Sequence, residues 1–93
     1  MYISSASLTF HIPHASSLKD KRQIARSVIE KTRHKFNASV AEVDDMDNHQ
    51  RLTIGICLVA NNASYSQKCI EQIIRFMEEI ANADLVDVQI WQD

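Results

Sequence analysis

Two hydrophobic periodicities follow one another along the chain and predict its secondary structure. Over residues 2–12, apolar and polar residues alternate with a period of two, which is typical of a β-strand with one buried face. Ser16 or Ser17 can then cap a helix, and Ser17 and Asp20 have the spacing of a capping box. Apolar positions recur every 3.6 residues until Asn37, where a left-handed helix stop is expected. This pattern predicts an amphipathic α-helix of about five turns. Its inner face is expected to hold Leu18, Ala25, Val28, Ile29, Thr32 and Phe36.

The second half of the chain predicts two strands, a helix and a final strand. Residues 38–43 and 51–60 are rich in Val, Ile and Leu and flank a polar run at 44–49, as in two antiparallel strands joined by a loop. Ser64 and Gln67 form a second capping box, which predicts the start of another amphipathic helix. The apolar face of that helix holds Ile70, Ile73, Ile74, Met77 and Ile80. In the last strand, apolar and other residues alternate over 86–91.

The element order is β-α-β-β-α-β, which predicts one α+β domain over residues 1–93. Right-handed crossovers place both helices on one face of a four-stranded antiparallel sheet, in the ferredoxin-like sandwich. A single Gly and a single Pro agree with long elements and short connections. In this topology the start of the first helix and the loop between the second and third strands lie at the same end of the sheet.

Composition and cysteine content predict a cytoplasmic protein. Hydrophobic residues make up 45% of the chain and charged residues 24%, as in ordinary globular proteins. Cys57 and Cys69 are not spaced for zinc binding, and we expect packed or half-packed thiols in a reducing compartment. The chain has neither the basic and apolar segments of a secretion signal nor the roughly 20 apolar residues of a membrane span.

The charges are unevenly distributed. Ten Lys and Arg residues against twelve Asp and Glu residues give a net charge of −2, so the chain as a whole is not a nucleic-acid polycation. Seven of the ten lie in the first predicted helix: Lys19, Lys21, Arg22, Arg26, Lys31, Arg33 and Lys35. Four of these occupy a stripe about 60° wide, namely Lys19, Arg22, Arg26 and Arg33. The alternative to a binding function is a solvated rim that covers the apolar face with its aliphatic stems.

The first turn of this helix is the more informative part. Lys19, Lys21 and Arg22 oppose the helix dipole, which favours anions at a helix N-terminus. Cations beside unpaired backbone N–H groups form an anion-binding arrangement. The anion could be an RNA phosphate, a small ligand or the chain's own carboxylates. The nearest such carboxylates are expected in the acidic loop, at Asp44, Asp45 and Asp47, as surface ion pairs.

Signs of catalysis or metal binding are few. The acidic loop and its neighbour His49 could supply metal ligands, but the loop lacks the glycine and closing glutamate of a calcium site. His11 and His14 could hold a metal or move a proton, or they could simply lie at an exposed strand end. No nucleophile stands beside a base and no glycine-rich phosphate loop is present. We therefore favour a non-enzymatic domain without a cofactor or a metal.

The sheet face opposite the helices is expected to carry small side chains. They come from the first and third strands and are Ser5, Ser7, Thr9, His11, Thr53, Gly55, Cys57 and Val59. The stacking aromatics of RNA-recognition domains of this topology are missing from these positions. Small residues allow another sheet to approach closely, so a homodimer through this open face is one hypothesis and a solvated face is the other.

Two segments resemble the YlxP family of small bacterial proteins. They are residues 17–22, with the sequence SLKDKR, and residues 35–43, with the sequence KFNASVAEV, and they are followed by Gln50 and Arg51. The resemblance implies a ferredoxin-like domain from a family whose genes often accompany those of translation and ribosome-maturation factors. It implies no particular catalytic or binding residue.

The leading functional hypothesis is contact with RNA or a ribosomal particle through phosphates. The residues expected to make these contacts are Lys19, Lys21, Arg22, Arg26 and Arg33. One alternative is a homodimeric regulatory domain that binds a small anionic ligand at the helix starts. Another is a protein-interaction module with no ligand of its own.

Overall fold

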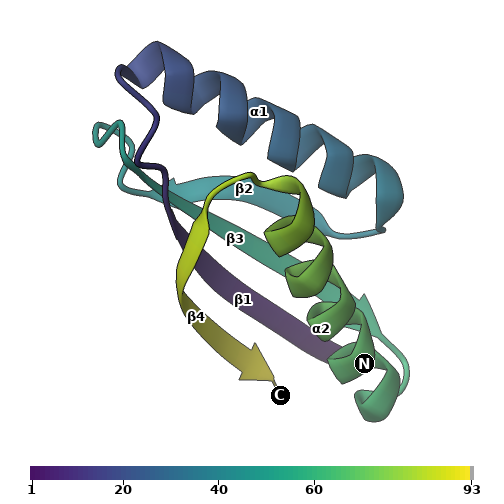
Figure 1. Cartoon of the computed structure of the whole chain (residues 1–93). Helices are drawn as coiled ribbons and strands as arrows, with labels where there is room; N and C mark the ends of the chain where they lie inside the picture. The colour runs from purple at the N-terminus through teal and green to yellow at the C-terminus, as the bar shows by residue number, and fades with distance from the viewer. Residues whose placement is uncertain (93) are drawn as a thin grey trace.

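The computed structural model describes residues 1–92, and it contains the six expected elements in the expected order (Figure 1). The elements are β1 (Tyr2–His11), α1 (Leu18–Lys35), β2 (Ser39–Asp44), β3 (Arg51–Ala60), α2 (Ala63–Ile80) and β4 (Asp84–Gln92). The strands form one sheet in the order β2-β3-β1-β4, with every neighbouring pair antiparallel. This confirms the predicted ferredoxin-like class.

Both helices lie on one face of the sheet, and the core fills the space between the layers (Figure 1). Alternation places Leu8 and Phe10 of β1 beside Ile54 and Leu52 of β3, and all four are fully buried. The inner faces of the two helices close the core with residues that include Val28 of α1. None of the helices over residues 1–92 has the length and apolar character needed to cross a membrane.

The helix ends agree with the sequence at one point and differ at two. Ser17 caps α1 as predicted, because its hydroxyl accepts the backbone N–H of Asp20 at 3.1 Å. In α2, however, the N-cap is Asn62 and not Ser64, because the Asn62 amide oxygen already accepts the N–H of Tyr65 at 2.9 Å. The left-handed stop expected at Asn37 is found instead at Asn82, after α2, with φ of 51°.

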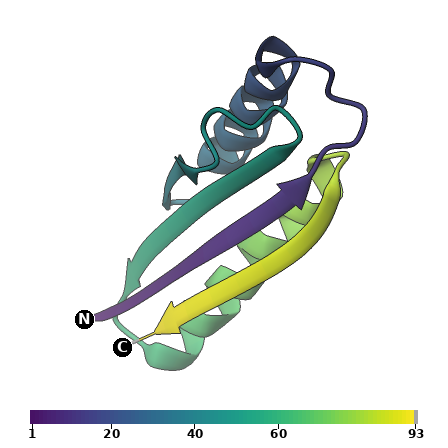
Figure 2. The same ribbon diagram turned by 90° about the vertical axis from the view of Figure 1, so that its left-hand side faces the viewer.

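The last strand is less covered than its neighbours. α1 packs chiefly over β2, and α2 packs over β1 and β3, so β4 meets the helices only weakly. Val88 and Ile90 pair with the buried Leu8 and Ala6 of β1, yet they remain 37% and 47% exposed. Figure 2 shows the open face of the sheet with the helices behind it, and β4 forms one outer edge.

Candidate nucleic-acid interface

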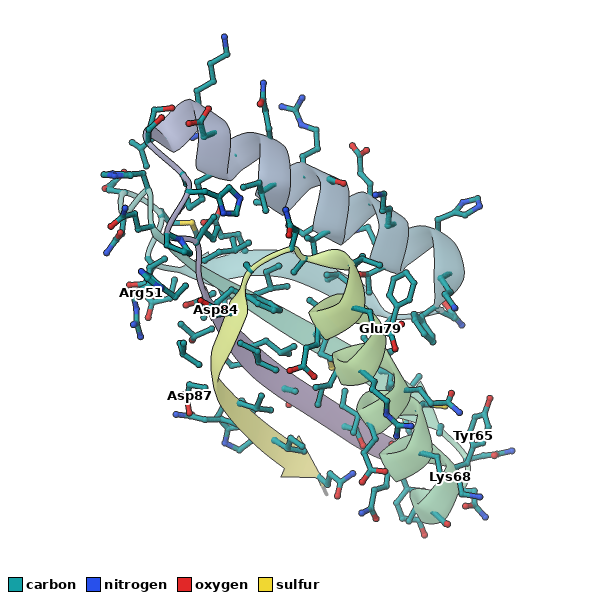
Figure 3. The ribbon with its side chains drawn as sticks, viewed as in Figure 1. Arg51, Tyr65, Lys68, Glu79, Asp84 and Asp87 are labelled. Carbon is teal, nitrogen blue, oxygen red and sulfur yellow. The ribbon has the colours of Figure 1, made fainter. Side chains whose placement is uncertain are left out.

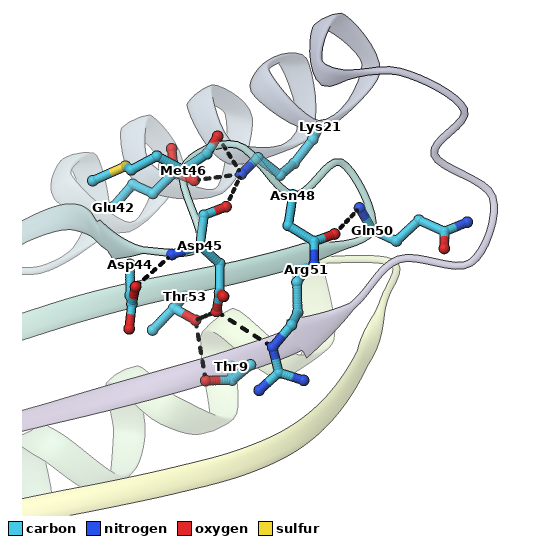
Figure 4. A network of polar contacts seen from close by, with 10 residues as sticks. All are labelled: Thr9, Lys21, Glu42, Asp44, Asp45, Met46, Asn48, Gln50, Arg51 and Thr53. Carbon is cyan, nitrogen blue, oxygen red and sulfur yellow. Dashed lines mark hydrogen bonds and ion pairs between the residues drawn. The ribbon is translucent and has the colours of Figure 1, made fainter.

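Lys21, one of the residues expected to contact an external anion, lies in the interior. Its side chain is 0% exposed. The ammonium donates to the carbonyls of Asp45 and Met46 at 2.7 and 3.0 Å and pairs with Glu42 Oε2 at 2.8 Å (Figure 4). That carboxylate oxygen is buried and, within residues 1–92, has no partner besides the ammonium. Because its ammonium is buried and already has three partners, Lys21 cannot contact an external anion, and its prediction as an anion-binding residue is wrong.

Burial of Lys21 is one of two outcomes that its position in the sequence predicts. Lys21 lies one turn after Leu18 and one turn before Ala25, so it falls in the middle of the apolar face of α1. A Lys in the middle of an apolar face is buried only where it has a charged or polar partner, so this position predicts either a buried, paired ammonium or a side chain that extends to the solvent. The spacing therefore separates Lys21 from Arg22, although the two are adjacent in sequence and equally charged.

The acidic loop is held across the end of the sheet through Asp45. Its backbone has a left-handed φ of 57°, which turns the carbonyl toward Lys21. Its carboxylate reaches the opposite face of the sheet, where Oδ2 accepts from Thr53 Oγ1 at 2.7 Å and from Arg51 Nε at 3.3 Å (Figure 4). The Thr53 hydroxyl in turn lies 3.2 Å from that of Thr9. One residue thus connects α1 with the open face.

The acidic loop does not neutralise the basic start of α1 through its carboxylates. The loop does meet α1, but through backbone carbonyls, and the carboxylate that pairs with Lys21 is Glu42 of β2. Asp44 and Asp47 are exposed and form no ion pair with α1 in the described chain. The predicted surface ion pairs between the loop acids and the helix are therefore wrong, because the loop turns its main chain toward Lys21.

The remaining cations of the stripe stay on the surface. Lys19, Arg22 and Arg26 are exposed, and across residues 1–92 the two ion pairs are Lys21–Glu42 and Arg51–Asp45. Arg33 is also exposed, and its Nη2 donates to the carbonyl of Val40 at 2.5 Å. We call Lys19, Arg22, Arg26 and Arg33 the α1 basic stripe. At 1.5 Å per residue, the stripe is about 21 Å long.

The very start of α1 is already occupied by a carboxylate. Asp20 Oδ2 accepts from both the hydroxyl and the backbone N–H of Ser16, at 2.7 and 3.1 Å. The hydrogen bond from the Ser16 hydroxyl, followed by that from its N–H, lowers the pKa of Asp20 below its usual value. The helix N-terminus therefore has its own anion, and the exposed cations lie along the outer face of α1.

A cleft at the other end of α1 brings cations and aromatic rings together. Lys35 Nζ lies 4.6 Å from the ring centre of Phe76 and 5.8 Å from that of Phe36. The two rings meet edge to face with centres 5.4 Å apart. The cleft between the helices has a volume of about 700 Å³ and is lined by Glu30, Lys31, His34, Lys35, Phe76 and Ile80. The sequence did not predict it, because the pairing of the rings is set by how the helices pack.

Other sequence candidates do not converge. His11 and His14 are exposed, and across residues 1–92 no three His, Cys, Asp or Glu side chains are grouped to hold a metal. Cys69 is half-buried as expected, and its thiol contributes to raising the pKa of Tyr65 through a hydrogen bond. Cys57 is exposed, so its prediction as a packed thiol is wrong. Its position on the open sheet face, which the helices do not cover, explains this exposure.

Fold and surface together define a ferredoxin-like α+β domain with a cationic outer helix. By family, the chain belongs to the one described as "Protein of unknown function (DUF503)", which matches residues 3–90. It is 30% identical over 64 residues to "Uncharacterized protein YlxP" from Bacillus subtilis (strain 168), an alignment that covers 69% of this chain and 70% of that protein. This confirms the resemblance found in the sequence.

Solved structures support the fold alone. An antibiotic biosynthesis monooxygenase matches with a TM-score of 0.52 and 21% identity, over 100% of this chain and 96% of that one. A de novo designed protein with a ferredoxin fold matches with a TM-score of 0.53 and 14% identity, over 100% of this chain and 83% of the designed one. A fold shared with both a natural monooxygenase and a designed sequence assigns no activity.

Proposed function

We propose that the protein is a non-enzymatic RNA-binding domain that contacts phosphates of structured RNA or a ribosomal particle through the α1 basic stripe. The observation that carries the proposal is the exposure of Lys19, Arg22 and Arg26 without an ion pair in the part of the chain that the structure describes. Phosphate contacts by Lys and Arg supply most of the sequence-independent affinity for nucleic acids.

The arrangement of acids near the stripe supports a binding role over a solvated rim. Opposite charges four residues apart on a helix stabilise it when they pair. Glu30 lies four residues after Arg26, yet over residues 1–92 it forms no ion pair with it. Asp20 accepts hydrogen bonds from Ser16. The stripe therefore keeps its positive charge available for an external anion.

The same geometry disfavours a small anionic ligand at the start of α1. Such a ligand would need unpaired N–H groups and a local excess of positive charge. At the start of α1, however, the carboxylate of Asp20 adds a negative charge, and the Lys21 ammonium is already bound by the Asp45 carbonyl and Glu42. An extended polyanion fits better, because the exposed cations are spread over about 21 Å of helix. The translation-linked gene setting implied by the YlxP resemblance also favours RNA.

The test is a triple variant, Lys19→Gln/Arg22→Gln/Arg26→Gln, measured against a structured RNA hairpin and purified ribosomal particles. Each lost phosphate contact should reduce the slope of log affinity against log salt by about 0.7–0.9, so three lost contacts reduce it by roughly 2–3. A matched control, Lys31→Gln/Lys68→Gln/Arg75→Gln, removes the same charge from three other exposed residues. The proposal fails if both variants lose affinity equally, or if the first binds as the natural chain does.

A further inference from the structure

The two edges of the sheet are built differently. β2, at one edge, has six residues and an irregular register between Glu42 and Asp44. Its Val40 carbonyl already accepts from the guanidinium of Arg33. Shortness, a bulge and a side-chain partner are the usual means by which proteins prevent an edge strand from pairing with another chain. The β2 edge is therefore protected.

β4, at the opposite edge, lacks these protections over most of its length. It has nine residues, contains no Lys, Arg or Pro, and pairs with β1 on one side only within residues 1–92 (Figure 2). Its exposed apolar side chains are Val86, Val88, Ile90 and Trp91. An edge strand that is long, apolar and uncharged in its second half is suited to strand addition.

The charges of β4 indicate which strand it can accept. Its two acids, Asp84 and Asp87, lie in the first half of the strand (Figure 3). The second half carries the neutral amides of Gln89 and Gln92. An antiparallel copy of the same strand would place the acidic half of each chain against the neutral half of the other. A parallel copy in register would bring like charges together, which is unfavourable. The strand is thus self-complementary in the antiparallel sense.

Geometry then limits the register. Directly opposite residues share a face of the sheet, so a two-fold axis perpendicular to the sheet has to pass midway between two copies of the same residue. The register of β1 with β4 shifts between Thr9 and Phe10, which leaves Val86 as the extra residue of a bulge. The regular part of β4 therefore begins at Asp87. Axes at Gln89 and at Ile90 both pair five residues outside the bulge and keep the two Asp87 side chains apart. The axis at Gln89 sets Val88 against Ile90 in both symmetric contacts, whereas an axis at Ile90 would set Val88 against the polar Gln92, so the apolar pairing favours Gln89.

We propose that a second copy of this chain binds to β4 by antiparallel strand addition, with the two-fold axis at Gln89. This joins two four-stranded sheets into one continuous sheet. On the side of the helices, Val88 lies against the partner's Ile90, and the symmetric pair repeats the contact. Both side chains are partly exposed in the single chain, so pairing removes apolar surface from water.

The open sheet face is less suited to such an assembly. The acidic loop reaches over it through Asp45, and Thr9 and Thr53 are buried beneath that contact although no helix covers them. A second sheet would have to displace the loop before it could pack flat. Pairing at the β4 edge requires no such displacement. Because five paired residues make an interface smaller than the usual area of about 800 Å² per partner, association is expected to be reversible and concentration-dependent.

Sedimentation over a concentration series tests the assembly. The natural chain should rise from its monomer mass of 10.6 kDa toward twice that value. Val88→Lys should stay monomeric throughout, because it places two charges against the apolar contact. The control Val59→Lys changes an exposed valine of the open face and should dimerise normally. A natural chain that is monomeric at every concentration overturns the proposal, and so does a dimer lost in Val59→Lys but kept in Val88→Lys.

Cysteine crosslinking tests the register in a Cys57→Ser/Cys69→Ser background, which removes both native thiols. Gln89→Cys places two thiols opposite each other on the axis and should form a disulfide-linked dimer under mild oxidation. Asp87→Cys is the control on the same strand, since its two copies would be separated by about 13 Å along the paired strands. Crosslinking through residue 87 and not residue 89, or through neither, contradicts the proposed pairing.

Discussion

The Lys21 ammonium is saturated by two carbonyls and one carboxylate, and these tie three elements together. It comes from the first turns of α1, its carboxylate partner Glu42 belongs to β2, and its carbonyl partners belong to the loop that follows β2. Removing one partner of a buried charge pair costs far more than the pair contributes, because the other charge stays buried and unpaired. The residue thus has a structural function, in contrast to its exposed neighbour Arg22.

Lys21→Met keeps a long apolar stem and removes the charge, and we expect it to lower the free energy of unfolding by about 3–5 kcal/mol. The control Arg22→Met should change it by no more than about 0.5 kcal/mol, because Arg22 is exposed and forms no ion pair over residues 1–92. Urea unfolding followed by circular dichroism measures both. Adding Glu42→Gln to Lys21→Met should recover part of the loss, since it removes the orphaned charge. Equal effects of the two single variants would contradict a structural function for Lys21.

At the scale of the element, hydrophobic periodicity predicted which helices and strands form. The exact start of α2 and the exposure of β4 depend on tertiary contacts. The period-2 and 3.6-residue patterns predicted all six elements, because each buries one face. The start of α2 was misplaced because Asn62 and Ser64 are both good caps and only the backbone path selects between them. The alternation in β4 predicted a strand but not its exposure, which depends on where α2 lies across the sheet.

For the basic helix α1, too, the sequence predicted some features and not others. Angular spacing correctly predicted that Lys19, Arg22, Arg26 and Arg33 share one outer stripe, because a helix has a fixed rise and rotation. Counting charges near the helix start wrongly grouped Lys21 with them, since that argument ignored its position on the apolar face. The cleft beside Phe76 could not be predicted, because it joins residues of α1 with residues of α2 that are far apart in sequence.

The start of α1 gives a prediction that depends on pH. Hydrogen bonds from Ser16 lower the pKa of Asp20 in the folded state below the ordinary value of 3.8, which applies to the unfolded chain. Such a carboxylate stabilises the fold above pH 3.8, and its contribution disappears as the pH falls through the lower folded-state pKa. Asp20→Asn should therefore unfold at a lower urea concentration at neutral pH, and the difference from the natural chain should shrink in acid.

Two measurements check this assignment of Asp20. Titration of its carboxyl carbon by NMR should give a pKa below 3.8, and Ser16→Ala should move that pKa upward, because the Ser16 hydroxyl is the largest cause of the shift. A difference in stability between Asp20→Asn and the natural chain that persists unchanged in acid would show that the carboxylate charge is not responsible.

At the scale of the whole molecule, the two proposed surfaces lie at opposite edges of the sheet. α1 covers β2 at one edge, and β4 forms the other (Figure 2). A dimer through β4 would therefore leave both α1 basic stripes exposed on distal parts of one particle. Two weak sites on one particle gain affinity for a polyanion long enough to reach both, because the second contact becomes intramolecular. Each surface can also be disabled without changing the other.

This separation predicts how Val88→Lys should bind RNA. A short hairpin that occupies one stripe should bind Val88→Lys and the natural chain with equal affinity, since β4 is remote from α1. A long RNA that spans both stripes should bind Val88→Lys more weakly, by a factor of about 10² or more where linkage is efficient, at protein concentrations where the natural chain is dimeric. The substitution adds a positive charge, so an electrostatic effect alone would strengthen binding and not weaken it. Fluorescence anisotropy with both RNAs measures the difference, and equal weakening for the short and the long RNA would show that Val88→Lys perturbs α1 itself.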